Sequence, residues 1–328
     1  MNNKHITTKN ILITIILFIC IYCMSTCFLN NQESTPMTCN LIIDRFEQEF
    51  FEIQDSIFDI ELIQCKEKYP SFFSGPDLDI KKDLFFNDTL RSVYDSVNLS
   101  FGFRVPRENE LREGFCHYKK YFPLDTFSIV TYIDYDFDYR YPVVFANQQL
   151  FLSLHMFLGS GHSFYNSLPS YIHFSHDTLF LPASCFITLA GRHIPISPAN
   201  NLLESMLYAA KPYFFTQYML PNIDEYQLLK CEPEKVEWCN KNESIIWQYM
   251  IENEFLFSSS SELIDRFVSL APFSKFGLDI DSSSPGGVGG WVGLQILHAY
   301  AENNNVSLID VLNETDYMKI LNKSGYKP

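Results

Sequence analysis

Five of the eight histidines lie close together in the sequence, and they are the side chains with the clearest potential for metal chemistry. They are His155, His162, His173, His176 and His193. A zinc site needs three or four donors that converge at about 2 Å from the ion, and the spacing of His173 and His176 suits neighbours on a helix. The segment has no HExxH motif and no acid at a comparable offset. We therefore interpret these histidines chiefly as surface or core residues, with a metal-dependent hydrolase of rearranged ligands as the alternative.

Covalent catalysis by serine or cysteine is not indicated. The sequence GSGH at residues 159–162 lacks the spacing of a GxSxG nucleophile elbow. Cys116 and His117 are adjacent on a predicted helix, where neighbouring side chains point apart. The serine run 258–261 followed by Glu262 is typical of a helix cap and start.

A glycine-rich segment at residues 284–293 leads into a predicted helix. Glycine-rich turns that open a helix can bind phosphate, but no parallel strand precedes this turn and no GK[ST] sequence follows it. The structural interpretation is favoured, in which Gly289 and Gly293 let the helix approach a neighbour closely. Together with Trp291 they are also the candidate residues of a cleft or binding surface, and we predict no cofactor and no metal ion.

The composition excludes several classes of protein. The 328-residue chain is 47% apolar and 19% charged, which excludes intrinsic disorder as the overall class. Its formal net charge is -15, from 39 acidic and 24 basic residues, and no run of lysine and arginine stands out. Such a chain repels phosphate backbones, so nucleic acid is not an expected partner.

The first 27 residues have the organisation of a bacterial lipoprotein signal. Lys4 and Lys9 precede an apolar run at residues 11–22. This run is shorter than the roughly 20 residues of a membrane span. The sequence MSTC that ends at Cys27 resembles a degenerate lipobox. We predict a signal peptide at 1–26, a lipidated Cys27 with a tether at 27–42, and one domain at 43–328. The alternative is an uncleaved anchor helix; both place the bulk of the chain outside the cytoplasm.

Six cysteines remain beyond Cys27, namely Cys39, Cys65, Cys116, Cys185, Cys231 and Cys239. An even number in an oxidising compartment permits up to three disulfides. No CxxC pair occurs among them, so neither a zinc ribbon nor a redox dithiol is indicated. In so apolar a chain we expect some of them to be buried thiols.

The first half of the predicted domain changes from helical to extended periodicity. A helix is predicted from Asp44, with a buried stripe at Phe46, Phe50, Ile53 and Ile57. Further helices are predicted at 83–98 and 108–122, the second ended by Pro123. The β-branched and aromatic residues that follow predict strands at 127–133, 143–146 and 149–157. We expect these to form a small antiparallel sheet.

The second half is predicted to be mostly helical, with long helices at 198–218, 232–254 and 288–302. Pro212 lies within the first of these, where a kink or break is expected. Trp238 and Trp247 lie nine residues apart on the second, on opposite sides, so we expect them to pack against different neighbours. No repeat or internal linker is visible, and we predict a single helix-rich α+β domain.

Several motifs resemble those of the GldB family, the gliding-motility lipoproteins of the Bacteroidota, over about residues 43–328. The specific parts are MFLG at 156–159, FYNSLPSY at 164–171, WCN at 238–240 with NE at 242–243 and Trp247, APFSKF at 271–276, SPG at 284–286, GLQI at 293–296 and KSGYKP at 323–328. The resemblance implies an envelope lipoprotein that is required for gliding in motile members and tied to type IX secretion. Members also occur in organisms that do not glide.

The GldB family is in turn similar to gluzincin-type zinc proteases, in which a helix carries HExxH. The corresponding helix is predicted at 201–215, where Glu204 takes the place of the motif's glutamate and Leu203 and Leu207 take the places of its histidines. Leucine cannot bind zinc, and without a metal-bound water Glu204 has nothing to activate. The resemblance therefore implies an inactive, zincin-like scaffold in which Glu204 is a vestige or an ordinary hydrogen-bonding acid.

From these features we predict a non-enzymatic cell-envelope lipoprotein that supports gliding motility or the type IX secretion machinery. Its partners would be the membrane, through the lipid, and other envelope, secretion or motility proteins. No acidic cluster follows Cys27, and surface-export signals in this phylum resemble such clusters, so we expect an outer-membrane anchor that faces the periplasm. Besides the hydrolase, the alternative is a binder of glycan or peptide that uses the aromatic loop 134–141.

Overall fold

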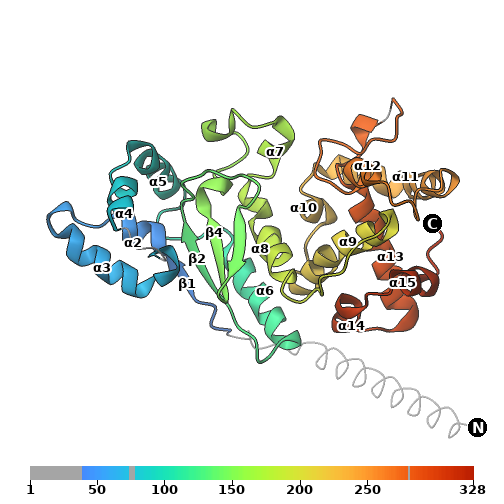
Figure 1. Ribbon diagram of the computed structural model, residues 1–328, viewed down its shortest axis with the longest axis horizontal. Coiled ribbons are helices and arrows are strands. Elements are labelled where there is room, and N and C mark those ends of the chain that lie inside the picture. The colour runs from blue at the N-terminus through green and yellow to red at the C-terminus, as the bar shows by residue number, and fades with distance from the viewer. Residues whose placement is uncertain (1–38, 74–77, 280) are drawn as a thin grey trace, which may run out of the picture. The chain divides into compact units, whose positions relative to one another are not determined.

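The computed structural model describes residues 39–73, 78–279 and 281–328. These residues form one helix-rich α+β unit with a small four-stranded sheet (Figure 1). The unit begins at Cys39, so residues 39–42, predicted as the end of the tether, belong to it. The predicted signal peptide and Cys27 lie outside the described residues.

The sheet is mixed, and the prediction of a purely antiparallel sheet was wrong. Its order is β1 (Ile43–Arg45), β2 (Ser128–Tyr132), β4 (Gln149–Ser153) and β3 (Val143–Ala146). Only β3 and β4 pair antiparallel, whereas β1–β2 and β2–β4 are parallel. The hairpin turn places Asn147 and Gln148 at φ 48° and 60°, the two positive values that a type I′ turn requires. The parallel pairs depend on the chain crossing over between strands, which local sequence does not specify.

Both faces of the sheet are buried, because successive side chains point to opposite sides. Val130 and Phe151 pack into an aromatic cluster with α2 (Phe46–Phe51), α3 (Phe58–Lys68) and α5 (Asp88–Phe101). Ile129, Leu150 and Leu152 belong to the main core on the other face, beside α6 (Glu108–Tyr121) and α8 (Leu181–Ala190). Figure 1 shows the sheet between these two groups of helices.

The helix predicted from Asp44 is instead a short strand followed by separate helical segments. Residues 43–45 form β1, α2 ends at Phe51, and a 3-10 turn at Asp55–Ile57 leads into α3. Phe46, Phe50 and Ile53 are buried as predicted, but Ile57 is 39% exposed. The stripe was interrupted because Gln54 takes an extended conformation between the two segments. The helix α4 (Leu78–Phe85) then precedes α5.

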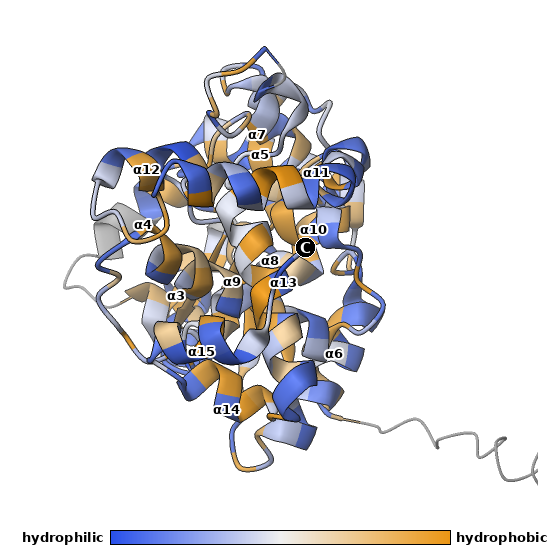
Figure 2. Cartoon of the chain, turned by 90° about the vertical axis from the view of Figure 1, so that its right-hand side faces the viewer, coloured by the Kyte–Doolittle hydropathy of each residue, from blue (hydrophilic) through white to orange (hydrophobic). Residues whose placement is uncertain are grey.

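The central helix of the second half is α9 (Leu202–Met219), which contacts α6, α8, α12, α13, α14 and α15. It runs without a break through Pro212. In Figure 2 the hydrophobic colouring gathers on α8 and α13 in the interior, while α15 shows a largely hydrophilic outer side. The remaining helices are α7 (Ser170–Phe174), α10 (Glu225–Leu229), α11 (Pro233–Glu252), α12 (Ser261–Phe267), α13 (Val288–Asn304), α14 (Leu308–Asn313) and α15 (Tyr317–Ser324).

Close packing of α13 against its neighbours depends on glycine. A Cβ atom at Gly293 would lie 2.4 Å from the carbonyl oxygen of Met206 on α9, and one at Gly289 would lie 2.8 Å from that of Phe267 on α12. Real Cβ atoms essentially never approach that closely. The close helix approach predicted from the glycine-rich segment is therefore confirmed.

One disulfide joins the start of the domain to a helix. Cys39 is bonded to Cys116 on α6, at a sequence separation of 77. The other four cysteines of the described residues, Cys65, Cys185, Cys231 and Cys239, are buried thiols, as expected for part of the set. Burial raises the pKa of the Cys65, Cys185 and Cys231 thiols to about 12, so these groups stay protonated at neutral pH.

A buried lysine ties α9 to the end of α14. The Lys211 side chain is fully buried, and its Nζ donates hydrogen bonds to the carbonyl oxygens of Leu312 (2.9 Å) and Glu314 (2.6 Å). These carbonyl groups lie at the C-terminal end of α14, where the last carbonyl oxygens of a helix have no N–H donor within the helix. Burial lowers the pKa of Lys211 to about 8, because the interior disfavours the charged form.

This lowered pKa predicts a pH dependence of stability. Between about pH 8 and pH 10.5 the unfolded chain keeps a proton on Lys211 that the folded chain has lost, so the contribution of Lys211 to the unfolding free energy should rise with pH. The buried thiols, whose pKa values are raised, act in the opposite direction in both proteins. We expect the difference between the wild type and Lys211→Met to grow in favour of the wild type across this range. Urea unfolding at matched pH values measures it, and the comparison cancels the cysteines and tyrosines that titrate in both proteins. A difference that stays constant from pH 7 to pH 10.5 would contradict the burial of a charged lysine.

Candidate functional site

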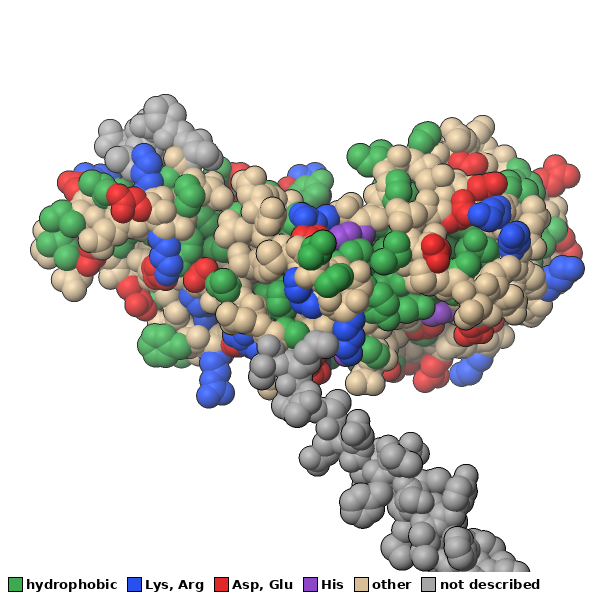
Figure 3. Space-filling view, turned by 90° about the horizontal axis from the view of Figure 1, so that it is seen from below, with side chains coloured by type: hydrophobic (Ala, Val, Ile, Leu, Met, Phe, Trp, Pro, Cys, Tyr) green, Lys and Arg blue, Asp and Glu red, His purple; other side chains and the backbone are tan. Residues whose placement is uncertain are grey.

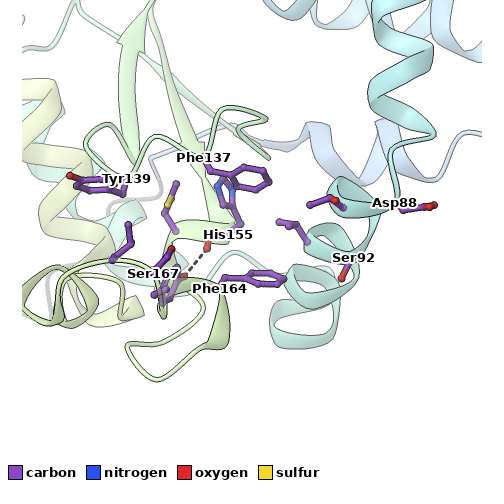
Figure 4. Close-up of a pocket in the computed structure, with 12 residues that line it drawn as sticks. Asp88, Ser92, Phe137, Tyr139, His155, Phe164 and Ser167 are labelled. Carbon is purple, nitrogen blue, oxygen red and sulfur yellow. Dashed lines mark hydrogen bonds between the residues drawn. The ribbon is translucent and has the colours of Figure 1, made fainter.

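A cavity of about 590 Å³ lies between α5 and the segment that follows β2 and β4. Four of its lining residues form a buried floor, namely Val93, His155, Met156 and Tyr165. The rest form a partly exposed rim, namely Asp88, Thr89, Ser92, Phe137, Tyr139, Phe164, Ser167 and Leu168. Figure 4 shows Asp88 and Ser92 on the α5 side, with Phe164, Ser167 and Tyr139 on the opposite side. A mostly apolar floor with few polar groups is the usual composition of a ligand site.

The floor has two polar side-chain groups, the Tyr165 hydroxyl, which is hydrogen-bonded, and the His155 ring, which is not. His155 is 3% exposed, and neither of its ring nitrogens has a hydrogen-bond partner. Burial, with a smaller effect from His176, lowers the pKa of His155 to about 3. The ring is therefore neutral at pH 7, with one nitrogen as a donor and the other as an acceptor. Leaving such a buried group unsatisfied costs about 1–3 kcal/mol.

Two aromatic residues hold His155 in place. The Tyr165 hydroxyl donates to the His155 carbonyl oxygen (2.6 Å), shown by the dashed line in Figure 4, and accepts from the Leu158 N–H (3.0 Å). The Phe137 ring lies edge-on to the His155 ring, with 5.4 Å between centroids. Phe137 has φ 53°, a left-handed conformation that is unfavourable for a bulky residue.

The loop that carries Phe137 is organised by Asp134. The Asp134 carboxylate accepts hydrogen bonds from the backbone N–H groups of Asp136 (3.2 Å) and Asp138 (3.0 Å). Asp138 in turn forms an ion pair with Arg140. These local contacts are typical of an aspartate-supported turn, and they hold Phe137 over the floor of the cavity.

The five clustered histidines do not converge on one point. His176 bonds the Met156 carbonyl oxygen through Nδ1 (2.7 Å) and stacks on Tyr165, whereas His193 bonds the Tyr118 hydroxyl (2.9 Å) and stacks on Phe122. Among residues 39–73, 78–279 and 281–328, no group of three or more His, Cys, Asp or Glu side chains could hold a metal ion. The described residues therefore offer no metal site for the alternative of a metal-dependent hydrolase with rearranged ligands.

The helix compared with the protease motif has an apolar, fully buried face. Leu203 and Leu207 on α9 are both 0% exposed, so the predicted packing of this pair is confirmed. Glu204 accepts hydrogen bonds from the Asn200 N–H (2.8 Å) and the Asn201 side-chain amide (2.9 Å), while the Asn201 side chain caps the helix through the Glu204 N–H (3.0 Å). Glu204 therefore acts as an ordinary helix-capping acid.

Comparison with known proteins settles the family. A family model described as gliding motility protein GldB matches residues 29–328. The chain belongs to the GldB family. No curated protein and no solved structure matches it, so the zincin-like relationship of this GldB family member stays a prediction.

The three glycine-rich-segment candidates occupy interior positions in this GldB family member. Trp291 is 0% exposed, and its indole N–H donates to Glu225 (2.8 Å), which also accepts from Gln295 (3.1 Å). Gly289 and Gly293 lie against the backbone of neighbouring helices. We therefore assign packing roles to these residues instead of contact with a ligand.

The sequence indicated some residues of the cavity, but it did not predict that they lie around one cavity. Phe137 and Tyr139 belong to the aromatic loop 134–141 that was predicted as a contact surface, and they do line the cavity. His155 was noted only as one of five histidines. Ser167 was noted only within the family motif FYNSLPSY at 164–171. Thr89 and Ser92 were missed, because isolated hydroxyl residues on a helix carry no signal in a single sequence.

Proposed function

We propose that this GldB family member is a non-enzymatic envelope lipoprotein that supports gliding motility or the type IX secretion machinery. The match to the GldB family over residues 29–328 carries the proposal. Two buried leucines at the places of the protease histidines support a non-catalytic role. The scaffold would then be a zincin-like fold that no longer binds zinc.

One observation supports a place outside the cytoplasm. The Cys39–Cys116 disulfide suits an oxidising compartment, because cytosolic thiols are normally kept reduced. In the described ranges, no helix has the length and apolar character of a membrane span. Attachment through a lipid at Cys27 accounts for membrane association, with other envelope proteins as partners.

The surface gives no support to nucleic acid as a partner. The chain has a net charge of -15, and on the face shown in Figure 3 basic side chains are interspersed with acidic ones. A phosphate backbone would gain little from such a surface.

Deletion of the gene in its parent bacterium tests the proposed role. We expect loss of spreading on agar, or loss of secreted type IX cargo in a strain that does not glide, with both restored by the wild-type gene. A complementing Glu204→Gln gene should restore them equally, because a capping acid with no metal has no catalytic role. Unchanged spreading and secretion in the deletion strain would refute the proposal.

Lipidation of Cys27 is a separate prediction. Radiolabelled fatty acid should enter the wild-type chain but not Cys27→Ser, because the acyl groups would be attached to that cysteine. Cys23→Ser is the matched control, since Cys23 lies in the same segment and should leave the label unchanged. Equal labelling of Cys27→Ser and the wild type would exclude this anchor.

The orientation of the anchored domain is tested on intact cells. If the domain faces the periplasm, protease added outside the cells should leave the chain whole until the outer membrane is permeabilised. Degradation in intact cells would instead place the domain on the cell surface.

A further inference from the structure

The cavity contains an unfavourable arrangement that a ligand could relieve. His155 on its floor is almost fully buried and leaves both ring nitrogens without partners. Phe137 above it is held at φ 53°. Strained backbone and unsatisfied buried polar groups often mark functional sites. Here both occur at the same point of a cavity that is large enough for a small ligand.

Phe137 indicates which kind of group fits against His155. Its ring meets the imidazole edge-on, with an interplanar angle of 89°, a favourable arrangement for two aromatic rings. A phenyl ring has no polar atom, so it covers His155 without satisfying it. Phe137 is itself 39% exposed, and it lies on the rim and belongs to neither of the hydrophobic clusters of the described residues.

The charges of the lining limit the ligand further. Neither lysine nor arginine is among the lining residues, and the one acid, Asp88, is exposed on the rim. An anionic group would have no partner on the floor, and a neutral His155 would not offset a buried charge. A sugar would bring several hydroxyl groups to a floor on which the His155 ring is the one polar side-chain group without a partner, which leaves most of them unsatisfied.

We propose that this cavity binds an uncharged aromatic side chain with a hydrogen-bonding group, tyrosine or tryptophan, presented by a protein partner. The incoming ring displaces Phe137, and its O–H or N–H bonds to a ring nitrogen of His155. That the ring belongs to a protein partner rests on the proposed envelope function. The rim also carries the hydroxyl groups of Thr89, Ser92 and Ser167, which can form hydrogen bonds with the flanking peptide backbone of that partner.

Two small probes test the site on the purified full chain. The probes are N-acetyl-L-tyrosinamide and N-acetyl-L-phenylalaninamide, which differ by one hydroxyl group. We expect the wild type to bind the tyrosine probe roughly two- to tenfold more tightly, as one hydrogen bond provides. His155→Phe should reduce that ratio to near one, and Phe137→Ala should tighten binding of both probes because the covering ring is gone.

Histidine ring nitrogens provide a readout that needs no variant. In the chain labelled with ¹⁵N-histidine, the His155 signals should move with the tyrosine probe and much less with the phenylalanine probe. Equal affinities of the wild type for the two probes, a ratio unchanged in His155→Phe, or binding of methyl glucoside in place of both would each overturn the proposal. Spreading and secretion by the deletion strain are measured independently, so failure here would leave the envelope role standing.

Discussion

Replacing Trp291 with alanine is expected to lower the free energy of unfolding by about 3–5 kcal/mol. Trp291 is among the largest side chains with no exposure to solvent. Its removal leaves a cavity beside α9 and also removes the hydrogen bond from the indole N–H to Glu225. Glu225 would keep only its contact with Gln295. Urea unfolding followed by circular dichroism measures the change.

Trp238→Ala is the matched control for this result. Trp238 on α11 is partly exposed and contacts Phe276 at 6.1 Å between ring centroids. Because less of its surface is buried, its loss should cost clearly less than that of Trp291. Equal effects of the two substitutions would contradict the assignment of Trp291 to the core.

Trp247 contacts Tyr326, so the prediction that Trp238 and Trp247 pack against different neighbours is confirmed.

Removal of the Cys39–Cys116 disulfide is expected to cost about 2–4 kcal/mol of stability. The bond closes a loop with 77 residues of sequence separation, and long loops gain most from closure because the unfolded chain loses more freedom. It also fixes residue 39, where the domain begins, to α6. The double variant Cys39→Ser/Cys116→Ser tests this by urea unfolding.

A reductant provides the control for the disulfide. Dithiothreitol should lower the unfolding free energy of the wild type toward that of the double variant, and should leave the double variant unchanged. The four remaining cysteines of residues 39–328 are buried thiols, so they should add no reductant-sensitive stability. Stability of the wild type that does not respond to reduction would show that the bond does not constrain the chain.

Local periodicity was sufficient for the parts of the fold that depend on neighbouring residues. The helix predicted at 108–122 is Glu108–Tyr121, and the strand predicted at 143–146 has those bounds. Three-residue β1 was not predictable, because so short a segment has no period and is a strand only through its pairing with β2. The parallel pairing joins residues more than 80 positions apart, beyond any local pattern.

The candidate site illustrates the same limit. Residue types alone pointed to the aromatic loop 134–141, since aromatic rings in a polar loop can stack on a sugar, although they can equally well close the edge of a core. The packing of Phe137 on His155 is a tertiary contact, and the missing hydrogen-bond partner of His155 is a property of the folded interior. For Glu204 the sequence suggested more than the structure shows. The motif comparison implied that it is the vestige of a catalytic glutamate, whereas its hydrogen bonds are those of a helix cap.

The central claim is that this GldB family member performs its role without a catalytic metal, and the zinc content of the purified full chain tests it most directly. With Leu203 and Leu207 buried at the places of the motif's histidines, we predict zinc far below one atom per chain by elemental analysis. One tightly held zinc per chain, together with chelator-sensitive cleavage of casein that is lost in Glu204→Gln, would contradict the account.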